Sequence, residues 1–381
     1  GFGLTSQEAA AMSCVADATG GLLLTPQTGQ ELADALNQIA AVEPVPAPEP
    51  VPEPEPGRVE AAGPESEPEP PEDPRDRIDL GLRPDESGKI MVLMYHNIGP
   101  EEAEWVRTPE NFRKDLETLY EEGYRPVRLS DYVEGTIDTP AGFTPVVITF
   151  DDANLNNFNI LEDGSVDPDC AFGILTEFHR QHPDFPVHTT FFANGQNPFR
   201  QPEHLDAKVE MLLAAGMDLG NHTENHENFR DADGSAIQRA IGAQAQYLES
   251  LAPSGYRVDT LALPYGSRPR QEDLMGYLVE GNHGGYDYRN RAVLNVGWHP
   301  APSPYAADFD PASIPRIRAS ETKVDQVGMY NYLESFRSRP GERFISDGVP
   351  EVITVPRDRQ DTLADIPEDR ILYVYETEEE E

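Results

Sequence analysis

Two continuous apolar runs, at 90–95 and 145–150, constrain the fold of this chain more than any other feature of its sequence. A strand that is apolar at every position is typical of a parallel strand covered on both faces, because a half-exposed strand alternates apolar with polar residues. Between the runs, Thr108 is a predicted helix N-cap and Pro109 the first helical residue, with apolar residues at helical spacing up to Gly123.

Further strand and helix patterns alternate along the rest of the chain. Strands are predicted at 187–193, 217–221, 260–263, 292–296 and 314–317. Helical patterns lie between several of them, at 205–215, 235–251 and 271–279. This alternation predicts an α/β fold whose parallel sheet forms either a barrel or a doubly wound layer.

A stretch rich in Pro and Glu divides the chain into parts. Residues 43–78 alternate Pro with Glu, Val and Ala without apolar periodicity, which predicts an extended linker that repels itself. Residues 1–42 hold a short strand and helix pattern, 79–375 form the predicted main domain, and 376–381 form an acidic tail. Because the chain begins at Gly1 without methionine, we expect the first segment to be the end of a larger domain.

The composition excludes several classes of protein. The formal net charge is −40, so nucleic acids and anionic membranes, which carry charge of the same sign, are not expected partners. No stretch approaches the run of about 18 apolar residues that a membrane-spanning helix needs, so the chain is not expected to be an integral membrane protein. The two cysteines, Cys14 and Cys170, exclude a disulfide scaffold and a thiolate-rich zinc site.

Polar side chains directly follow three of the predicted strands. Asp151 and Asp152 follow one strand, His222 and His226 follow another, and the triplet PYG at 264–266 follows a third. Because the C-terminal ends of parallel strands share one edge, where ligands bind, we expect these segments to meet. Taken singly, the three features are often a helix cap, surface histidines and a turn, and only their common position favours a functional site.

The residue types at this edge suit a divalent metal. Two histidines four residues apart can present both imidazoles on one side of a turn, and one carboxylate completes a three-ligand site with an open position. That arrangement fits catalytic zinc best. A second carboxylate beside the metal, but not bound to it, can accept a proton from a water that the metal activates.

These segments resemble a known family. The motifs are TFDD at 149–152, TTFF at 189–192 with Gly195, HTENH at 222–226 and LPYG at 263–266. Their order and approximate spacing are similar to those of the polysaccharide deacetylases, the NodB-homology enzymes of carbohydrate esterase family four, over residues 89–355.

The resemblance implies a fold, an activity and a set of roles. The fold is expected to be a distorted (β/α) barrel of the NodB type. The expected activity is hydrolysis of acetyl groups from an N-acetylated or, as the second choice, an O-acetylated polysaccharide outside the cytoplasm. Asp151 would be the general base, Asp152 with His222 and His226 would bind zinc, and the backbone N–H of Tyr265 would donate to the oxyanion.

Departures from the family pattern leave two roles open. Ala262 stands where an Arg usually orients the base, and the usual motif with the acid histidine is not visible. His299 is the predicted substitute acid, with an ordinary loop histidine before a proline as the alternative, and Arg316 is the predicted substitute for the orienting Arg. Ala153 also stands where many relatives have Gly.

A long insertion follows the Asp pair at 154–186. Connections of this length usually carry function or cover a site. Its Phe158, Asn156, Asn157 and Asn159 are predicted either to line a sugar-binding cleft or, more simply, to pack the loop against the barrel.

Two other functions compete with the enzyme. The missing Arg and acid motif favour a glycan-binding module of the cell envelope that keeps the metal pocket without efficient chemistry. Residues 14–21 and 30–36 resemble the last strand and helix of a von Willebrand factor A-type domain, which favours an adhesion or scaffolding protein. A region before Gly1 is expected to tether the chain to the envelope in either case.

Overall fold

The structure, a computed structural model, describes residues 73–377. The predicted von Willebrand-like segment and almost all of the predicted linker and acidic tail lie outside these residues. The described part opens with the short 3-10 helix η1 (Pro74–Arg77), which Asp73 caps. Arg77 pairs with Glu351 at 3.0 Å, so this helix contacts the C-terminal part of the domain.

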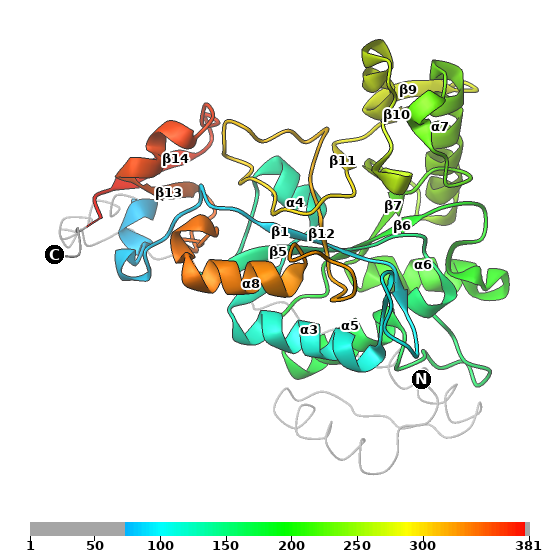
Figure 1. The fold of residues 1–381 in the computed structure, drawn as a ribbon, viewed down its shortest axis with the longest axis horizontal. Coiled ribbons are helices and arrows are strands. Elements are labelled where there is room, and N and C mark those ends of the chain that lie inside the picture. Colours follow the sequence, from blue (N-terminus) through cyan, green and yellow to red (C-terminus); the bar gives the residue numbers. More distant parts are fainter. Residues whose placement is uncertain (1–72, 378–381) are drawn as a thin grey trace, which may run out of the picture. The chain divides into compact units, whose positions relative to one another are not determined.

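The centre of the domain is a parallel sheet in the order β11-β8-β7-β6-β5-β1-β12, with β4 beside the start of β5. Its strands are β1 (Met91–Tyr95), β4 (Tyr124–Pro126), β5 (Thr144–Phe150), β6 (Thr189–Ala193), β7 (Asp218–Asn221), β8 (Thr260–Ala262), β11 (Ala292–Leu294) and β12 (Ile317–Arg318). The sheet curls, and a bridge between Leu294 and Ile314 connects β11 to the segment that leads into β12 (Figure 1). This incomplete barrel confirms the predicted distorted (β/α) barrel.

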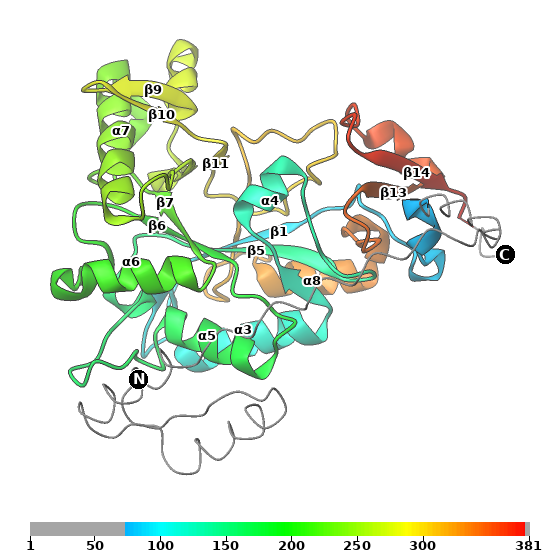
Figure 2. The ribbon, with the colours of Figure 1, turned by 180° about the vertical axis from the view of Figure 1, so that it is seen from behind.

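Helices cover the outer side of the curled sheet: α3 (Pro109–Glu121), α5 (Ala171–Gln181), α6 (Leu205–Ala214), α7 (Gly234–Leu251) and α8 (Met329–Ser338). A further helix, α4 (Leu129–Glu134), packs Leu129 and Tyr132 against the inner side of the sheet. Helices α3, α5 and α8 lie together beneath β1 and β5 (Figures 1 and 2). Helix α3 begins as predicted, because the side chain of Thr108 accepts a hydrogen bond from the backbone N–H of Asn111 at 3.2 Å.

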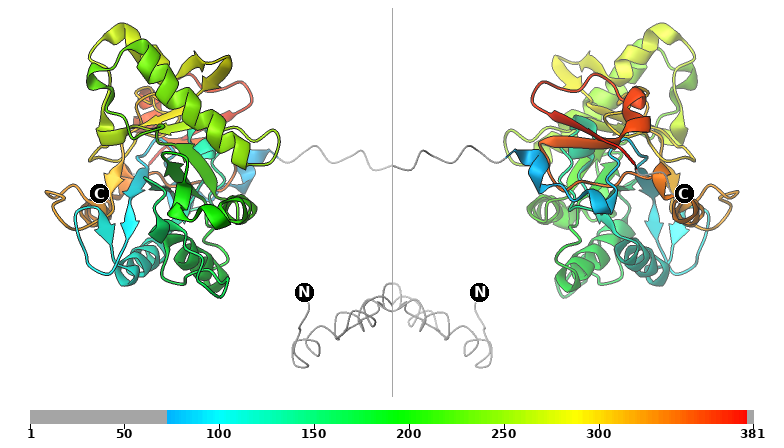
Figure 3. Two further views of the ribbon diagram at one scale, coloured as in Figure 1. Left: turned by 90° about the vertical axis from the view of Figure 1, so that its right-hand side faces the viewer. Right: turned by 90° about the vertical axis from the view of Figure 1, so that its left-hand side faces the viewer.

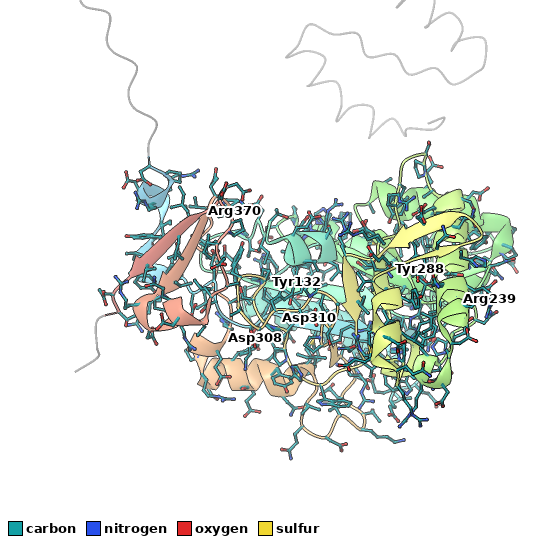
Figure 4. The ribbon with its side chains drawn as sticks, turned by 90° about the horizontal axis from the view of Figure 1, so that it is seen from above. Tyr132, Arg239, Tyr288, Asp308, Asp310 and Arg370 are labelled. Atoms are coloured by element: carbon teal, nitrogen blue, oxygen red, sulfur yellow. The ribbon has the colours of Figure 1, made fainter. Side chains whose placement is uncertain are left out.

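Smaller elements complete the domain at its two ends. The strands β9 (Glu280–His283) and β10 (Tyr286–Arg289) form a hairpin whose turn, Gly284 and Gly285, has positive φ at both residues. This hairpin, which carries Tyr288, lies at one end, and β13 (Val352–Pro356) with β14 (Ile371–Tyr375), next to Arg370, lies at the other (Figure 4). The remaining elements are β2 (Asn97–Ile98), β3 (Val106–Arg107) and the 3-10 helices η2 (Leu80–Leu82), η3 (Leu155–Asn157), η4 (Pro198–Arg200), η5 (Pro202–His204), η6 (Phe229–Asp231), η7 (Pro264–Gly266), η8 (Glu272–Leu278), η9 (Pro340–Glu342) and η10 (Arg357–Thr362).

Two local predictions differ from the structure. The helical pattern at 271–279 forms the 3-10 helix η8 rather than an α-helix, and Gly276 in its middle lowers helix propensity. The insertion at 154–186, expected as a loop, contains the helix α5, whose buried residues face the main core. Among the helices of residues 73–377, none is long and apolar enough to span a membrane.

Side chains alternate across β1 and β5 between two cores. Met91 and Leu93 of β1 pack outward against the helices, whereas Val92 and Val147 pack into a second cluster inside the curled sheet. The same alternation, continued one step past each strand, assigns His96 to the inner face after β1 and Asp151 to the inner face after β5. The fold therefore delivers polar groups to the C-terminal mouth of the barrel.

Candidate active site

The pairing of β1 with β5 brings His96 and Asp151 together. Tyr95 is paired with Phe150 in register, and the backbone N–H of Asp151 donates to the carbonyl of Tyr95 at 2.9 Å. The next residue on each strand therefore leaves the sheet at the same point. His96 Nε2 lies 3.9 Å from Asp151 Oδ2.

Asp152, His222 and His226 form a cluster that could hold a metal ion. One potential ligand atom of each residue lies within 4.8 Å of those of the other two. Asp152 Oδ1 is 3.7 Å from His222 Nε2 and 3.6 Å from His226 Nε2. Zinc binds such atoms at about 2.0–2.2 Å in tetrahedral geometry, which places neighbouring ligand atoms about 3.3–3.5 Å apart. The two distances from Asp152 Oδ1 exceed this by a few tenths of an ångström, so the residues fit the ion.

Neighbouring groups orient the side chains of this cluster and favour the protonation states that bind a cation. His222 Nδ1 lies 2.8 Å from the carbonyl oxygen of Ala262, and because a carbonyl only accepts, Nδ1 carries the proton and leaves the Nε2 lone pair free. The Asn194 side-chain amide donates to Asp152 Oδ1 at 2.9 Å. Burial, and then the neighbouring His222, lower the pKa of His226, which favours its neutral, metal-binding form.

Asp151 forms a buried ion pair with Arg316. The Nη1 and Nη2 atoms of Arg316 donate to the two carboxylate oxygens of Asp151 at 2.7 Å each, and the side chains are 0% and 1% exposed. Burial by itself raises the pKa of a carboxyl, but the Arg316 charge and hydrogen bonds outweigh it and hold the pKa of Asp151 well below its usual range. Asp151 is therefore ionised and fixed in one orientation.

Arg316 reaches this position because of how the barrel closes. The backbone of Ile314 pairs with β11, and β12, which follows Arg316 directly, pairs with β1. Arg316 Nε donates to the carbonyl of Asn295 at 2.8 Å, and Nη1 also contacts Thr149 Oγ1 at 3.2 Å. The guanidinium that holds Asp151 thus comes from a segment 165 positions away in the chain.

His96 is held in place by the insertion and by a tryptophan. The side-chain amide of Asn157 donates to the backbone carbonyl of His96 at 2.6 Å, and the Trp105 ring lies 4.7 Å from the His96 ring. Burial lowers the pKa of His96, and this effect exceeds the opposite effect of Asp151 and Asp152. His96 is therefore a second titratable group in contact with Asp151.

The backbone around the site is strained at several side-chain-bearing residues. Asp152, Ala153, Thr223, His226 and Tyr265 all have φ between 43° and 73°. Such left-handed conformations cost free energy outside glycine and persist where the surrounding structure enforces them. The position of Ala153, where relatives often have Gly, is one of them. At Asp152 and His226, this backbone conformation orients the side chains toward the metal-binding cluster.

Tyr265 lies at the open side of this cluster. Its ring is 66% exposed and contacts the His226 ring edge-on at a centroid distance of 4.6 Å. The triplet PYG forms the 3-10 helix η7, so its backbone lies beside the metal cluster as the common strand-end position predicts.

The structure places the other predicted residues as follows. His299 Nδ1 lies 3.1 Å from the carbonyl oxygen of the adjacent Pro300, and within residues 73–377 no ion pair joins its ring to Asp151 or Asp152. In the insertion, Phe158 is fully buried and stacks on Phe172 at 4.0 Å.

The asparagines of the insertion form hydrogen bonds to other parts of the protein rather than facing an open cleft. Asn156 donates to Asn97 at 3.3 Å, and Asn159 donates to Asp167 at 2.9 Å. Together with Asn157, which holds His96, they pack the insertion against the barrel, which favours the simpler of its two predicted roles.

Sequence reasoning missed two residues of the site. They are His96 and Asn194. Both follow directly after an apolar strand, so the signal that identified Asp151 and His222 was also present for them. They lacked a recognisable motif, and only the register of the strands shows that they meet the metal cluster.

Part of the chain is similar to known proteins. Residues 139–275 match the family model of the polysaccharide deacetylases, and no curated protein matches the chain. Among solved structures, the chain is similar to the deacetylase PplD of Streptococcus pyogenes, determined with acetate, at 19% identity, covering 65% of this chain and 97% of that one, with a TM-score of 0.49.

Two further structures are similar over most of the described domain. A polysaccharide deacetylase of Bacillus cereus is 16% identical, covering 66% of this chain and 68% of that one, with a TM-score of 0.46. IcaB of Ammonifex degensii is 16% identical, covering 64% of this chain and 97% of that one, with a TM-score of 0.45. The family match supports a polysaccharide deacetylase domain in the present chain.

Proposed function

We propose that this chain, which carries a polysaccharide deacetylase domain, uses a divalent metal to hydrolyse acetyl groups from an N-acetylated polysaccharide. One observation carries the proposal. Asp151, ionised and held by Arg316, adjoins Asp152, which forms a metal-binding cluster with His222 and His226. An oriented base next to a three-ligand site with an open position is the arrangement that metal-assisted hydrolysis requires.

Each residue has a distinct task in this proposal. A bound cation, zinc first among the candidates, would polarise the amide carbonyl and lower the pKa of a nearby water. Asp151 accepts the proton of the attacking water, because its carboxylate is ionised and fixed. The backbone N–H of Tyr265 donates to the oxygen that becomes negative in the transition state.

The leaving amine needs a proton, and two histidines compete to supply it. His96 is the candidate that the geometry favours, because its Nε2 lies 3.9 Å from Asp151 at the mouth of the barrel. His299 is the candidate from the sequence, and its ring contacts its own neighbour, Pro300. We propose His96 as the general acid; burial lowers its pKa, but the Asp151 carboxylate opposes that effect and favours the protonated ring that can donate.

The proposal also names a substrate class and a location. An N-acetylated glycan is the first choice and an O-acetylated glycan the second, since the same residues serve an ester. Such polymers belong to cell envelopes and the surrounding medium, so we place the protein outside the cytoplasm.

Acetate release tests the proposal. The full chain is incubated with chito-oligosaccharides, peptidoglycan, poly-N-acetylglucosamine and acetylated xylan, with a chelator and after zinc is added back. We expect release that the chelator abolishes and zinc restores. Asp151→Asn should lower the rate of acetate release by about 10²–10⁴-fold while still binding zinc. Asp206→Asn, which replaces an exposed carboxylate on α6, should have the wild-type rate.

The outcomes separate the proposed enzyme from the binding module. Undiminished activity in Asp151→Asn would remove Asp151 from its role as base. Zinc binding and glycan binding without release from any substrate would show a module that keeps the pocket without turnover.

A further inference from the structure

A cavity of about 330 Å³ lies beside the candidate active site. Four parts of the chain line it: Met94 of β1, Glu104 with Trp105, residues 296–298 after β11, and several residues between 318 and 327 at and after the end of β12. Figure 3 shows the β2 and β3 segment beside the loop that follows β12, and a hydrogen bond of 2.9 Å from Ser320 to the carbonyl of Ala103 joins them. The cavity therefore opens at the same end of the barrel as the metal cluster.

Both tryptophans of the chain line this one cavity. Trp105 is 39% exposed and Trp298 is 63% exposed. Large apolar rings are usually buried, and rings that stay exposed in a cleft are typical of binding surfaces. The chain therefore presents its two largest aromatic side chains to whatever enters this space.

The cavity contacts the residues that flank Asp151. The ring of Trp105 lies 4.7 Å from that of His96, which contacts Asp151. On the other side, a Cβ atom built on Gly297 would come within 2.9 Å of the backbone nitrogen of Arg316, so the cavity wall packs directly against that segment. The cavity therefore lies next to the residues that hold Asp151.

The charges that line the cavity balance. Arg318 and Lys323 are the two bases, Glu104 and Asp325 the two acids, and both bases pair with Glu104, at 3.0 and 3.2 Å. The Arg318 guanidinium also lies 4.8 Å from the centre of the Trp105 ring. The lining is thus apolar rings with polar groups between them and no net charge.

We propose that this cavity binds one uncharged sugar unit, the neighbour of the unit whose acetyl group is removed; this inference rests on the proposed function. A pyranose ring has an apolar face, which packs on indole, and hydroxyls, which hydrogen-bond to Glu104, Arg318 and Lys323. The volume lies near the lower end of the range for small-ligand clefts, about 300–1,000 Å³, which fits one ring rather than a longer segment. The site thus selects polymers over free monosaccharides.

Tryptophan fluorescence tests this directly, because both tryptophans line the cavity. The full chain, freed of metal with a chelator so that no turnover occurs, is titrated with the mono-, di- and tetrasaccharides of N-acetylglucosamine and with acetylated xylo-oligosaccharides. We expect a saturable change in emission with the oligosaccharides, half complete at about tenfold lower concentration for the tetrasaccharide than for the monosaccharide.

Kinetics of a variant provide a second readout. Trp298→Ala should raise KM for the tetrasaccharide about tenfold and leave kcat nearly unchanged. The reason is that the ring binds substrate away from the reacting atoms. Met211→Ala removes an exposed apolar side chain on α6, outside the cavity, and serves as the control. Trp105→Phe keeps a ring against His96 and should retain most of the affinity.

The outcomes distinguish this inference from the proposed function. Emission that no sugar changes, with acetate release intact, would overturn the cavity proposal alone. A saturable change without acetate release would support the cavity and contradict the hydrolysis. Binding confined to oligosaccharides that contain uronic acids would overturn the assignment of an uncharged unit, and loss of both signals would overturn both proposals.

Discussion

The two sides of the Asp pair are built in different ways. On the side of Asp152, the cluster comes from the turns that follow β5 and β7 and remains partly open, with the side chains of Asp152 24% and His226 31% exposed. On the side of Asp151, the partners come from the first and last strands of the sheet, and Asp151 and Arg316 are almost completely buried. The first side depends on local turns and the second on closure of the barrel.

This difference indicates which interactions stabilise each side of the Asp pair. The open side is shaped by strained backbone and is completed by a ligand, so changes there should alter metal affinity. The buried side is completed by the protein itself, so removing one charge leaves the other without a partner in a dry interior. The following predictions test this comparison, in order of decreasing effect.

The largest effect is expected at His96. His96→Gln should lower kcat/KM by about 10²–10⁴, because the leaving amine loses its proton donor, while zinc affinity is unchanged. Acetate release and zinc titration measure the two quantities. His299→Gln is the matched histidine control, and a larger loss in that variant than in His96→Gln would return the acid role to His299.

Arg316 should carry the next largest effect, on stability. Arg316→Met removes the guanidinium that pairs with both oxygens of the buried Asp151, so the free energy of unfolding of the metal-free protein should fall by about 3–5 kcal/mol, measured by urea denaturation. Arg239→Met on α7, whose pair with Glu224 is exposed (Figure 4), should cost about 1 kcal/mol or less. Equal losses in the two variants would contradict the contrast drawn above. Adding Asp151→Asn to Arg316→Met should recover part of the loss.

Asn194 tests the open side. Asn194→Ala removes the hydrogen bond to Asp152 Oδ1, so zinc affinity should weaken by about 10–100-fold while the rate at saturating zinc stays close to wild type. Competition with a chromogenic chelator measures the affinity. Asn282→Ala on the β9 and β10 hairpin is the control, and an equal loss there would mean that the amide of Asn194 does not orient the ligand.

The smallest effect concerns pH. A proton on His226 occupies the lone pair that the metal needs, and burial with the nearby His222 lowers the pKa of His226 below its ordinary value of 6.5. Zinc affinity should therefore stay level as pH falls to about 6.5 and decline only below it. Equilibrium dialysis at a series of pH values measures this. A steep decline between pH 8 and 7 would show that His226 is protonated too easily for this site.

Much of the fold could be predicted from the sequence. The runs at 90–95 and 145–150 became β1 and β5 within one residue at each end, because a strand buried on both faces must be apolar throughout. The helix α5 was missed although its apolar residues recur at helical spacing, because it is short and lies within a long insertion whose other residues show no such pattern. The β13 and β14 pair was missed because a small sheet at the end of a domain has short strands and no helical alternation around it.

The sequence by itself determined the cluster of Asp152, His222 and His226, because those residues follow strands whose order and direction the βα alternation already implies. Only the tertiary structure decided which groups complete Asp151. Strand register brings His96 to it, and the closing segment delivers Arg316 from 165 positions away. Contacts of that kind depend on how strands pair across the whole sheet, and no local pattern in the chain encodes which residues will face each other.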